Sequence, residues 1–251
     1  MDFTSSFSTL FDKKSKNVNF GSSPSSALAF EVHDELTDLI YQTVRSGCKT
    51  PMGAHVETFL SSLGSLAGFG CQMALRDGLI KPGLKKEKDL FTTVEGDDGG
   101  KYYFGTSLNR LLIEDRNSVF AIITGGIYRN GYSEYPNVFA ISKRVSQNIG
   151  GPDFGTINVP QSHQPLLRPI TSLRKFWPLL YPQISRHYAS LKRATLDPLS
   201  LGSLFAEVIQ LLMVETKNII PPPLSGQIAF EAAMAMASVD PAALAAQANQ
   251  A

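Results

Sequence analysis

Residues 58–75, TFLSSLGSLAGFGCQMAL, contain no charged side chain, and this run constrains the fold more than any other feature. Eighteen uncharged residues approach the length that crosses a bilayer, so they either span a membrane or lie in a protein interior. Several positions are nevertheless polar, namely Thr58, Ser61, Ser62, Ser65 and Gln72. No second comparable segment exists, so we predict a buried helix and no membrane association.

The spacing of the side chains predicts that this helix is buried on two sides. Its apolar residues recur at intervals of three and four and form one wide face. A second face is a stripe of small residues: Ser61, Gly64, Ser65 and Gly68. Small side chains allow a second helix to approach closely. The sequence leaves open whether that helix belongs to the same chain or to a second copy in a homodimer.

Before this helix, the sequence predicts a flexible lead-in and an amphipathic helix. Residues 1–24 are rich in Ser and Lys and form the lead-in. The helix runs from Ser25 or Ser26 to Arg45, with Gly47 as its stop. We expect it to form an antiparallel helical hairpin with the glycine-containing helix.

Residues 89–105, DLFTTVEGDDGGKYYFG, predict a β-hairpin because two β-prone runs flank a turn rich in Gly and Asp. Asp97 and Asp98 do not complete a calcium loop, since the alternating oxygen ligands and the closing Glu are absent. Short helices are expected after Thr106 or Ser107, after Asn117 or Ser118, and over 138–149. The second of these can also be read as a strand, because VFAII is short and apolar.

The C-terminal third predicts further helices separated by prolines. Residues 170–192 are expected to form two short helices broken at Pro178 or Pro182. A helix opens at Asp197-Pro198, and Pro221–Pro223 is expected to break the chain before IAFEAAMAMAS. The fold class is therefore mainly α, a multi-helix globular domain with one inserted β-hairpin. We expect one domain over 25–239 and an Ala-rich C-terminal tail or short helix over 240–251.

The overall charge argues against a nucleic-acid partner. The 251 residues include 23 Lys and Arg against 22 Asp and Glu, which gives a formal net charge of +1. Nucleic-acid-binding surfaces are usually strongly basic. The only cysteines are Cys48 and Cys71, so no disulfide framework is implied. The sequence leaves open whether these two form a single disulfide. With no apolar signal segment at the N-terminus, we expect a soluble protein of the cytoplasm.

No complete catalytic, cofactor or metal motif is present. His55-Val-Glu57 resembles the first half of the zinc-deaminase signature, but the Pro-Cys-x-x-Cys half is missing. The four histidines lack metal-ligand spacing, so no metal site is predicted. A P-loop, a dinucleotide fingerprint and a Gly-x-Ser-x-Gly elbow are all absent, and no cofactor is predicted. Enzymatic activity stays undecided, because many enzymes show no motif in a single sequence.

Residues 150–169, GGPDFGTINVPQSHQPLLRP, form the longest stretch without helical or strand periodicity. Long irregular segments in compact domains often frame a pocket or cover a partner surface. Four side chains in or near it can bind an anion or exchange a proton: Asp153, His163, Arg168 and Arg174. We treat them as candidate ligand-binding residues, with a structural network or an exposed loop as the alternative.

Two functions follow as hypotheses. The first is a soluble, non-enzymatic protein that acts through self-association or protein contact, which the small-residue stripe favours. The alternative is a protein or enzyme that binds a small anionic molecule in a pocket near residues 150–169.

Overall fold

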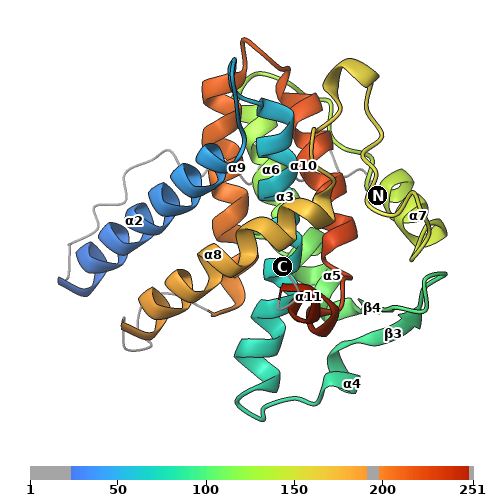
Figure 1. Ribbon diagram of the computed structural model, residues 1–251. Helices are drawn as coiled ribbons and strands as arrows, with labels where there is room; N and C mark the ends of the chain where they lie inside the picture. Colours follow the sequence, from blue (N-terminus) through green and yellow to red (C-terminus); the bar gives the residue numbers. More distant parts are fainter. Residues whose placement is uncertain (1–23, 191–197, 249–251) are drawn as a thin grey trace.

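Helix α3 (Val56–Leu75) lies at the centre of the molecule in the computed structural model, which describes residues 24–190 and 198–248 (Figure 1). Three helices pack around it: α8 (Pro169–Ser190), α9 (Leu201–Thr216) and α10 (Pro222–Met236). Nearly every α3 residue from Thr58 onward is buried. The predicted buried, uncharged helix is therefore confirmed, and its neighbours cover it on more than one side.

Helix α6 (Val119–Arg129) completes the bundle by packing against both α9 and α10. Its start is fixed by Ser118, whose hydroxyl accepts a hydrogen bond from the Ala121 N–H at 3.1 Å. This cap and the pairing with two helices explain why VFAII is helical rather than extended. Ser203 Oγ donates to the Asn117 carbonyl at 2.7 Å, so α6 and α9 begin at the same end of the bundle.

Helix α2 (Pro24–Gly47) packs on the outside, against α8 and α9. His33 Nε2 lies 2.6 Å from Glu207 Oε2, and Tyr41 donates a hydrogen bond to Glu215. The hydrogen bond that His33 donates to Glu207, together with the charge of that carboxylate, raises the pKa of His33 despite partial burial. These two contacts fix the side of α2 that faces α9.

The β structure consists of two small antiparallel hairpins among the residues described. The predicted hairpin is confirmed as β3 (Thr92–Glu95) paired with β4 (Lys101–Phe104). A second hairpin, β1 (Lys49–Thr50) with β2 (Gly53–Ala54), was not predicted and joins α2 to α3. The fold class is mainly α with β-hairpins, as expected.

Short elements complete the chain, and two of them are π-helical. The α-helices are α4 (Glu87–Leu90), α5 (Thr106–Asn109), α7 (Val138–Gln147) and α11 (Pro241–Ala248). The π-helical turns are η1 (Arg76–Ile80), which continues α3, and η2 (Arg110–Glu114), which continues α5. Two 3₁₀ turns are η3 (Gln161–His163) and η4 (Pro198–Ser200).

The predicted break inside residues 170–192 is wrong, because α8 is one continuous helix that contains Pro178 and Pro182. Both prolines lie on the exposed side of the helix, four residues apart. The carbonyl groups that lose a backbone donor to these prolines therefore lie on the side open to water, which reduces the penalty. Pro at an exposed helix position does not force a chain break.

A break between two helices is present near the predicted position, because residues 217–221 separate α9 from α10, but it ends earlier than expected, since α10 begins at Pro222. Proline is well tolerated in the first turn of a helix, where its missing N–H would have no intrahelical partner. Of the predicted terminal segments, residues 1–23 lie outside the described part of the chain, and α11 covers most of 240–251. Within the described ranges, no helix has the length and hydropathy needed to span a bilayer.

Candidate functional site

The small-residue stripe of α3 is covered by α10 of the same chain. A Cβ atom on Gly64 would overlap the carbonyl oxygen of Ala229, and one on Gly68 would overlap that of Ala233. Ser61 and Ser65 on the same stripe are fully buried. Because α10 occupies this face, the stripe serves close helix packing within the chain and offers no surface to a second copy.

The four candidate residues of the irregular segment have separate environments. Arg168 donates to the carbonyl oxygens of Pro152 at 2.6 Å and Phe154 at 3.1 Å, so it fixes its own loop. His163 contacts Glu57, whereas Asp153 and Arg174 are exposed. In residues 24–190 and 198–248, no hydrogen bond or ion pair joins any two of these four.

The irregular segment is anchored to the beginning of α3. His163 Nδ1 lies 2.9 Å from Glu57 Oε1, and His55 Nδ1 lies 3.6 Å from the other carboxylate oxygen. The Leu166 N–H donates to Thr58 Oγ1 at 2.8 Å. One carboxylate thus lies between two imidazoles, one from its own helix cap and one from a segment 106 residues away.

A second anchor is the carboxylate of Glu231 on α10, whose side chain is only 3% exposed. Its Oε2 accepts a hydrogen bond from the Asn158 N–H at 2.7 Å. Its Oε1 forms an ion pair with Arg144 of α7 and accepts a hydrogen bond from Gln227. Burying a carboxylate is costly unless it is paired and hydrogen-bonded. Glu231 therefore connects α10, α7 and the irregular segment.

The sequence analysis missed this second anchor, because it named neither Arg144 nor Glu231 as a candidate site residue. A usable signal was present. Glu231 is the only charged residue in IAFEAAMAMAS, and a lone carboxylate among buried positions needs a cationic partner.

The thiols and the potential metal ligands do not form a reactive centre in the described chain. Cys48 and Cys71 are both free and buried, so no disulfide joins them. Burial raises the pKa of each thiol, which disfavours the reactive thiolate. Among the side chains that the structure places, no three His, Cys, Asp or Glu residues gather to hold a metal ion.

An exposed aromatic segment, residues 128–139, connects the end of α6 to the first turn of α7. It carries four large exposed aromatic side chains: Tyr128, Tyr132, Tyr135 and Phe139, the last 79% exposed. Gly131 adopts a left-handed backbone with φ of 87° at the turn that follows α6. Asn137 caps α7 by accepting a hydrogen bond from the Ala140 N–H at 3.0 Å. Helical periodicity gave no indication of this surface.

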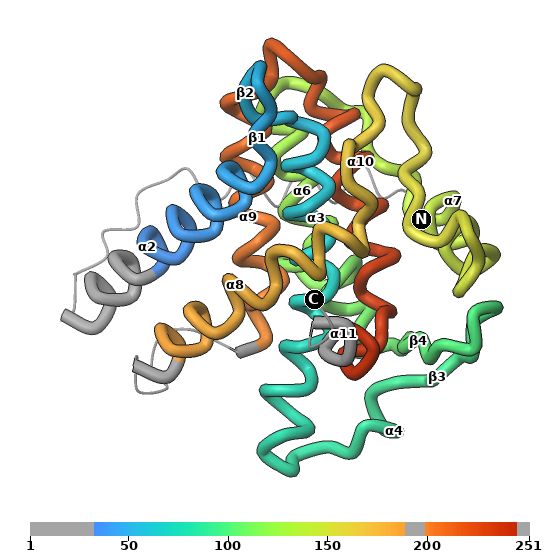
Figure 2. Tube along the Cα trace, viewed as in Figure 1, coloured from blue at the N-terminus to red at the C-terminus, as the bar shows by residue number. Residues whose placement is uncertain are grey.

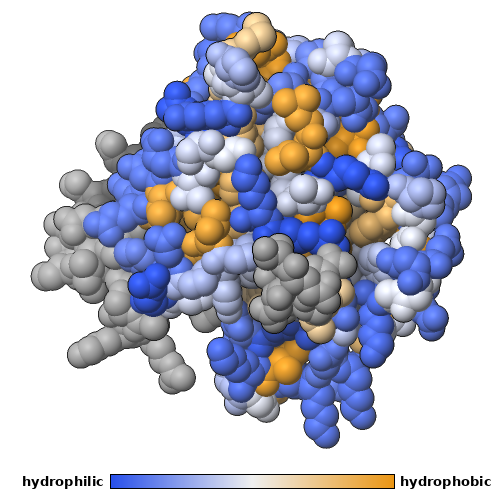
Figure 3. All heavy atoms as spheres, in the orientation of Figure 1, coloured by the Kyte–Doolittle hydropathy of each residue, from blue (hydrophilic) through white to orange (hydrophobic). Residues whose placement is uncertain are grey.

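The same end of the bundle carries further exposed apolar residues. The ends of α6 and α9 and the beginnings of α3 and α10 lie together there, with the β1–β2 hairpin, at the top of Figures 1 and 2. Met52 of the hairpin is 99% exposed, and Ile219 after α9 is 69% exposed. Figure 3 shows hydrophobic atoms on the surface at this end.

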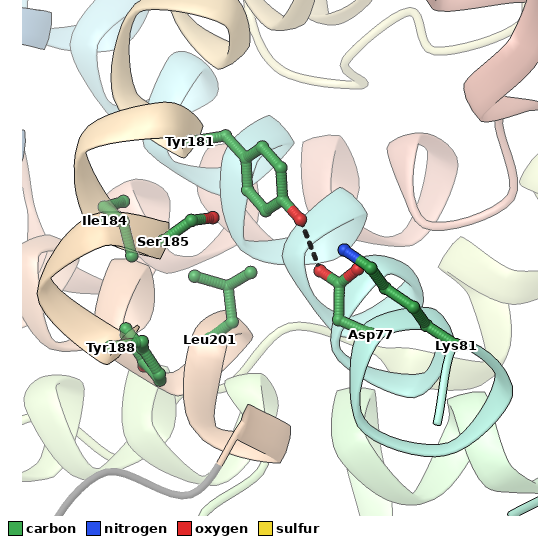
Figure 4. Close-up of a pocket in the computed structure, with 7 residues that line it drawn as sticks. All are labelled: Asp77, Lys81, Tyr181, Ile184, Ser185, Tyr188 and Leu201. Atoms are coloured by element: carbon green, nitrogen blue, oxygen red, sulfur yellow. Dashed lines mark hydrogen bonds between the residues drawn. The ribbon is translucent and has the colours of Figure 1, made fainter. Parts of the chain in front are cut away.

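A cavity of about 280 Å³ lies at the opposite end of α3, between η1, the second half of α8 and the start of α9. The residues that line it are Asp77, Lys81, Tyr181, Ile184, Ser185, Tyr188 and Leu201 (Figure 4). It lies outside the segment at 150–169 where a pocket was expected.

Comparison with known proteins adds no functional information. No protein-family model matches the chain, and neither the curated proteins nor the solved structures include a significant match. The function is therefore inferred from the residues described above.

Proposed function

We propose that this chain is a soluble, non-enzymatic protein of the cytoplasm that self-associates through its exposed aromatic segment, residues 128–139. The observation that carries the proposal is four large aromatic side chains exposed within twelve consecutive residues. Tyr and Phe are enriched at the centres of protein interfaces, where they contribute much of the binding energy. Two free, buried cysteines are consistent with a reducing compartment.

The composition of the segment suits recognition. Asn130, Gly131 and Ser133 are small or adaptable residues between the tyrosines. Tyrosine supplies a large amphipathic contact area with little loss of conformational entropy, and small polar neighbours let it reach a partner surface. The left-handed turn at Gly131 and the Asn137 cap of α7 fix the backbone of the segment.

The charges of the segment favour a second copy as the partner. Arg129 and Glu134 are both exposed, and neither side chain forms an ion pair with another residue in the described ranges. In a twofold contact, each surface meets itself, so residue i of one copy meets residue j of the other and the reverse. Arg129 of each copy would then pair with Glu134 of the other, and the interface would contain two such pairs.

The first test removes the aromatic side chains. Tyr132→Ser combined with Phe139→Ser should raise the dimer Kd at least about tenfold, which corresponds to about 1.4 kcal/mol. Leu84→Ser is the matched control, because Leu84 is 67% exposed but belongs to another segment. Sedimentation velocity measures all three proteins. An unchanged dimer Kd in the double variant would exclude this surface.

The second test reverses the charges. Arg129→Glu alone and Glu134→Arg alone should each weaken the dimer, since each places like charges opposite one another. The two changes combined in one chain should restore association toward the wild-type Kd. If the combined variant associates no better than the single variants, the proposed pairing is incorrect.

The alternative function, an anionic-ligand site along residues 150–169, has less support. His163 and Arg168 already contact groups of the chain itself, and Asp153 and Arg174 are exposed and do not line the cavity beside η1. We therefore favour protein contact.

A further inference from the structure

The cavity beside η1 has the size and the position of a small-molecule site. Its volume of about 280 Å³ is near the lower limit of ligand pockets, which begin at about 300 Å³. Asp77 belongs to η1, a π-helical turn, and π-helical insertions occur frequently at functional sites. The walls come from η1 and from the consecutive helices α8 and α9, which follow η1 about a hundred residues later in the chain, and the core fixes their relative positions.

One wall carries a carboxylate with a fixed orientation. Tyr181 Oη donates a hydrogen bond to Asp77 Oδ2 at 2.5 Å, and the Tyr181 ring stacks on Trp177 with 4.8 Å between the ring centroids. Burial and the hydrogen bond to Asp77 raise the pKa of Tyr181 to about 12, so the phenol stays a donor at neutral pH. The second Asp77 oxygen has no hydrogen-bond partner among the described residues and is left for a ligand.

A cation lies one helical turn beyond this carboxylate. Lys81 is exposed, and its ammonium group forms no ion pair or hydrogen bond with any residue that the structure describes. Figure 4 shows Asp77 and Lys81 on one side of the cavity and Ile184 and Tyr188 on the other. The polar side thus carries one negative and one positive charge, with a formal sum of zero.

The remaining wall is apolar. Ile184 and Leu201 are buried, and the Tyr188 ring lies beside them. Such a wall favours a hydrocarbon substituent on the ligand, because burying apolar surface stabilises the complex. Ser185 supplies a hydroxyl at the boundary between the polar and apolar parts.

We propose that this cavity binds a small zwitterion with an apolar side chain, of the chemical class of free aliphatic α-amino acids. The ligand's ammonium donates to the unoccupied oxygen of Asp77, and its carboxylate pairs with Lys81. Its side chain lies against Ile184 and Leu201. A ligand with only one charge forms only one of these two charge-assisted hydrogen bonds, so both charges are needed for full affinity.

The test is a titration of the full-length protein with L-leucine. Isothermal titration calorimetry and changes in amide chemical shifts detect the binding. We expect saturable binding. Two analogues that lack one charge, 4-methylpentanoate and 3-methylbutylamine, should each bind at least tenfold more weakly. No saturable signal with L-leucine, or equal affinity for either analogue, would overturn the proposal.

Single substitutions test whether L-leucine binds at Asp77 and Lys81, and they distinguish a loss of binding from a loss of folding. Lys81→Gln and Asp77→Asn should each reduce L-leucine affinity at least tenfold, whereas Lys85→Gln, an exposed lysine outside the cavity, should not. Because Lys81 is exposed, its substitution leaves the core intact, so this variant decides the question even if Asp77→Asn unfolds. Unchanged affinity in a folded Lys81→Gln protein would contradict the proposed pairing.

Discussion

Single charged residues hold the irregular segment in place. Glu231 supplies the clearest case, because its carboxylate is almost fully buried and accepts hydrogen bonds from two elements while it pairs with Arg144. The pairing of His163 with Glu57 fixes the same segment at a second point. Two anchors of this kind make the segment between α7 and α8 a fixed part of the surface rather than a free loop.

Glu231→Gln should lower the free energy of unfolding by about 2 kcal/mol, in the range measured for hydrogen bonds to charged groups. The reason is that Arg144 loses its counter-charge while the Asn158 N–H keeps only a neutral acceptor. Urea unfolding followed by circular dichroism measures the change. Glu114→Gln, at an exposed position, is the control. Equal stability of the wild type and Glu231→Gln would show that this carboxylate is not an anchor.

The contact between His33 and Glu207 should make stability depend on pH. The pKa of His33 is raised above its ordinary value of 6.5, first by the hydrogen bond that its imidazole donates to Glu207. A group whose pKa is higher in the folded state than in the unfolded state stabilises the fold. This stabilisation is complete at pH values below the unfolded-state pKa, and it is lost as pH rises through the folded-state pKa. The urea midpoint of the wild type should therefore be higher than that of Glu207→Gln in weakly acidic buffer. In weakly alkaline buffer the difference between the two midpoints should be smaller. A difference that grows with pH would contradict this assignment.

At the scale of elements, the close contact of α3 with α10 is the central packing feature. Gly68→Ala places a Cβ against the Ala233 carbonyl, which belongs to the backbone and cannot move aside. We expect a loss of about 1 to 3 kcal/mol in the free energy of unfolding, the usual effect of overpacking. Urea unfolding provides the measurement.

Gly125→Ala is the matched control for this substitution. Gly125 is also a buried helix glycine, but its added Cβ would lie 3.3 Å from Nε2 at the end of the Gln210 side chain, which donates to the Ile122 carbonyl, and would not overlap backbone. Alanine is the better helix former by about 1 kcal/mol, so this variant should be neutral or more stable. If both variants lose a similar free energy of unfolding, the cause would be a general intolerance of α3 and α6 to alanine in place of glycine, and not the specific contact of α3 with α10.

Local patterns predicted most elements, because the spacing of apolar residues depends on the element's own geometry. The buried α3 helix, the β3–β4 hairpin and the helical reading of residues 138–149 follow from such spacing. The prolines of α8 and α10 were misread because their effect depends on whether the freed carbonyl faces water and whether the residue lies in a first turn. Both conditions are set by tertiary structure.

At the scale of the whole molecule, the candidate sites were harder to predict than the fold. The partner of His163 is Glu57, 106 residues away, and the cavity joins Asp77 to Tyr181 across 104 residues. Periodicity within a segment carries no information on which distant segments meet. The sequence predicted the small-residue stripe as a face for close helix packing or self-association, and only the position of α10 shows that this face is filled from within the chain.

Self-association through residues 128–139 is the central claim, and sedimentation velocity of the wild-type protein over a wide concentration series tests it most directly. We predict a reversible shift from a monomer of 27.3 kDa to a species of twice that mass as concentration rises. The frictional ratio of the larger species should fit a twofold dimer joined at one end of each bundle. A strictly monomeric species at every concentration would contradict the claim.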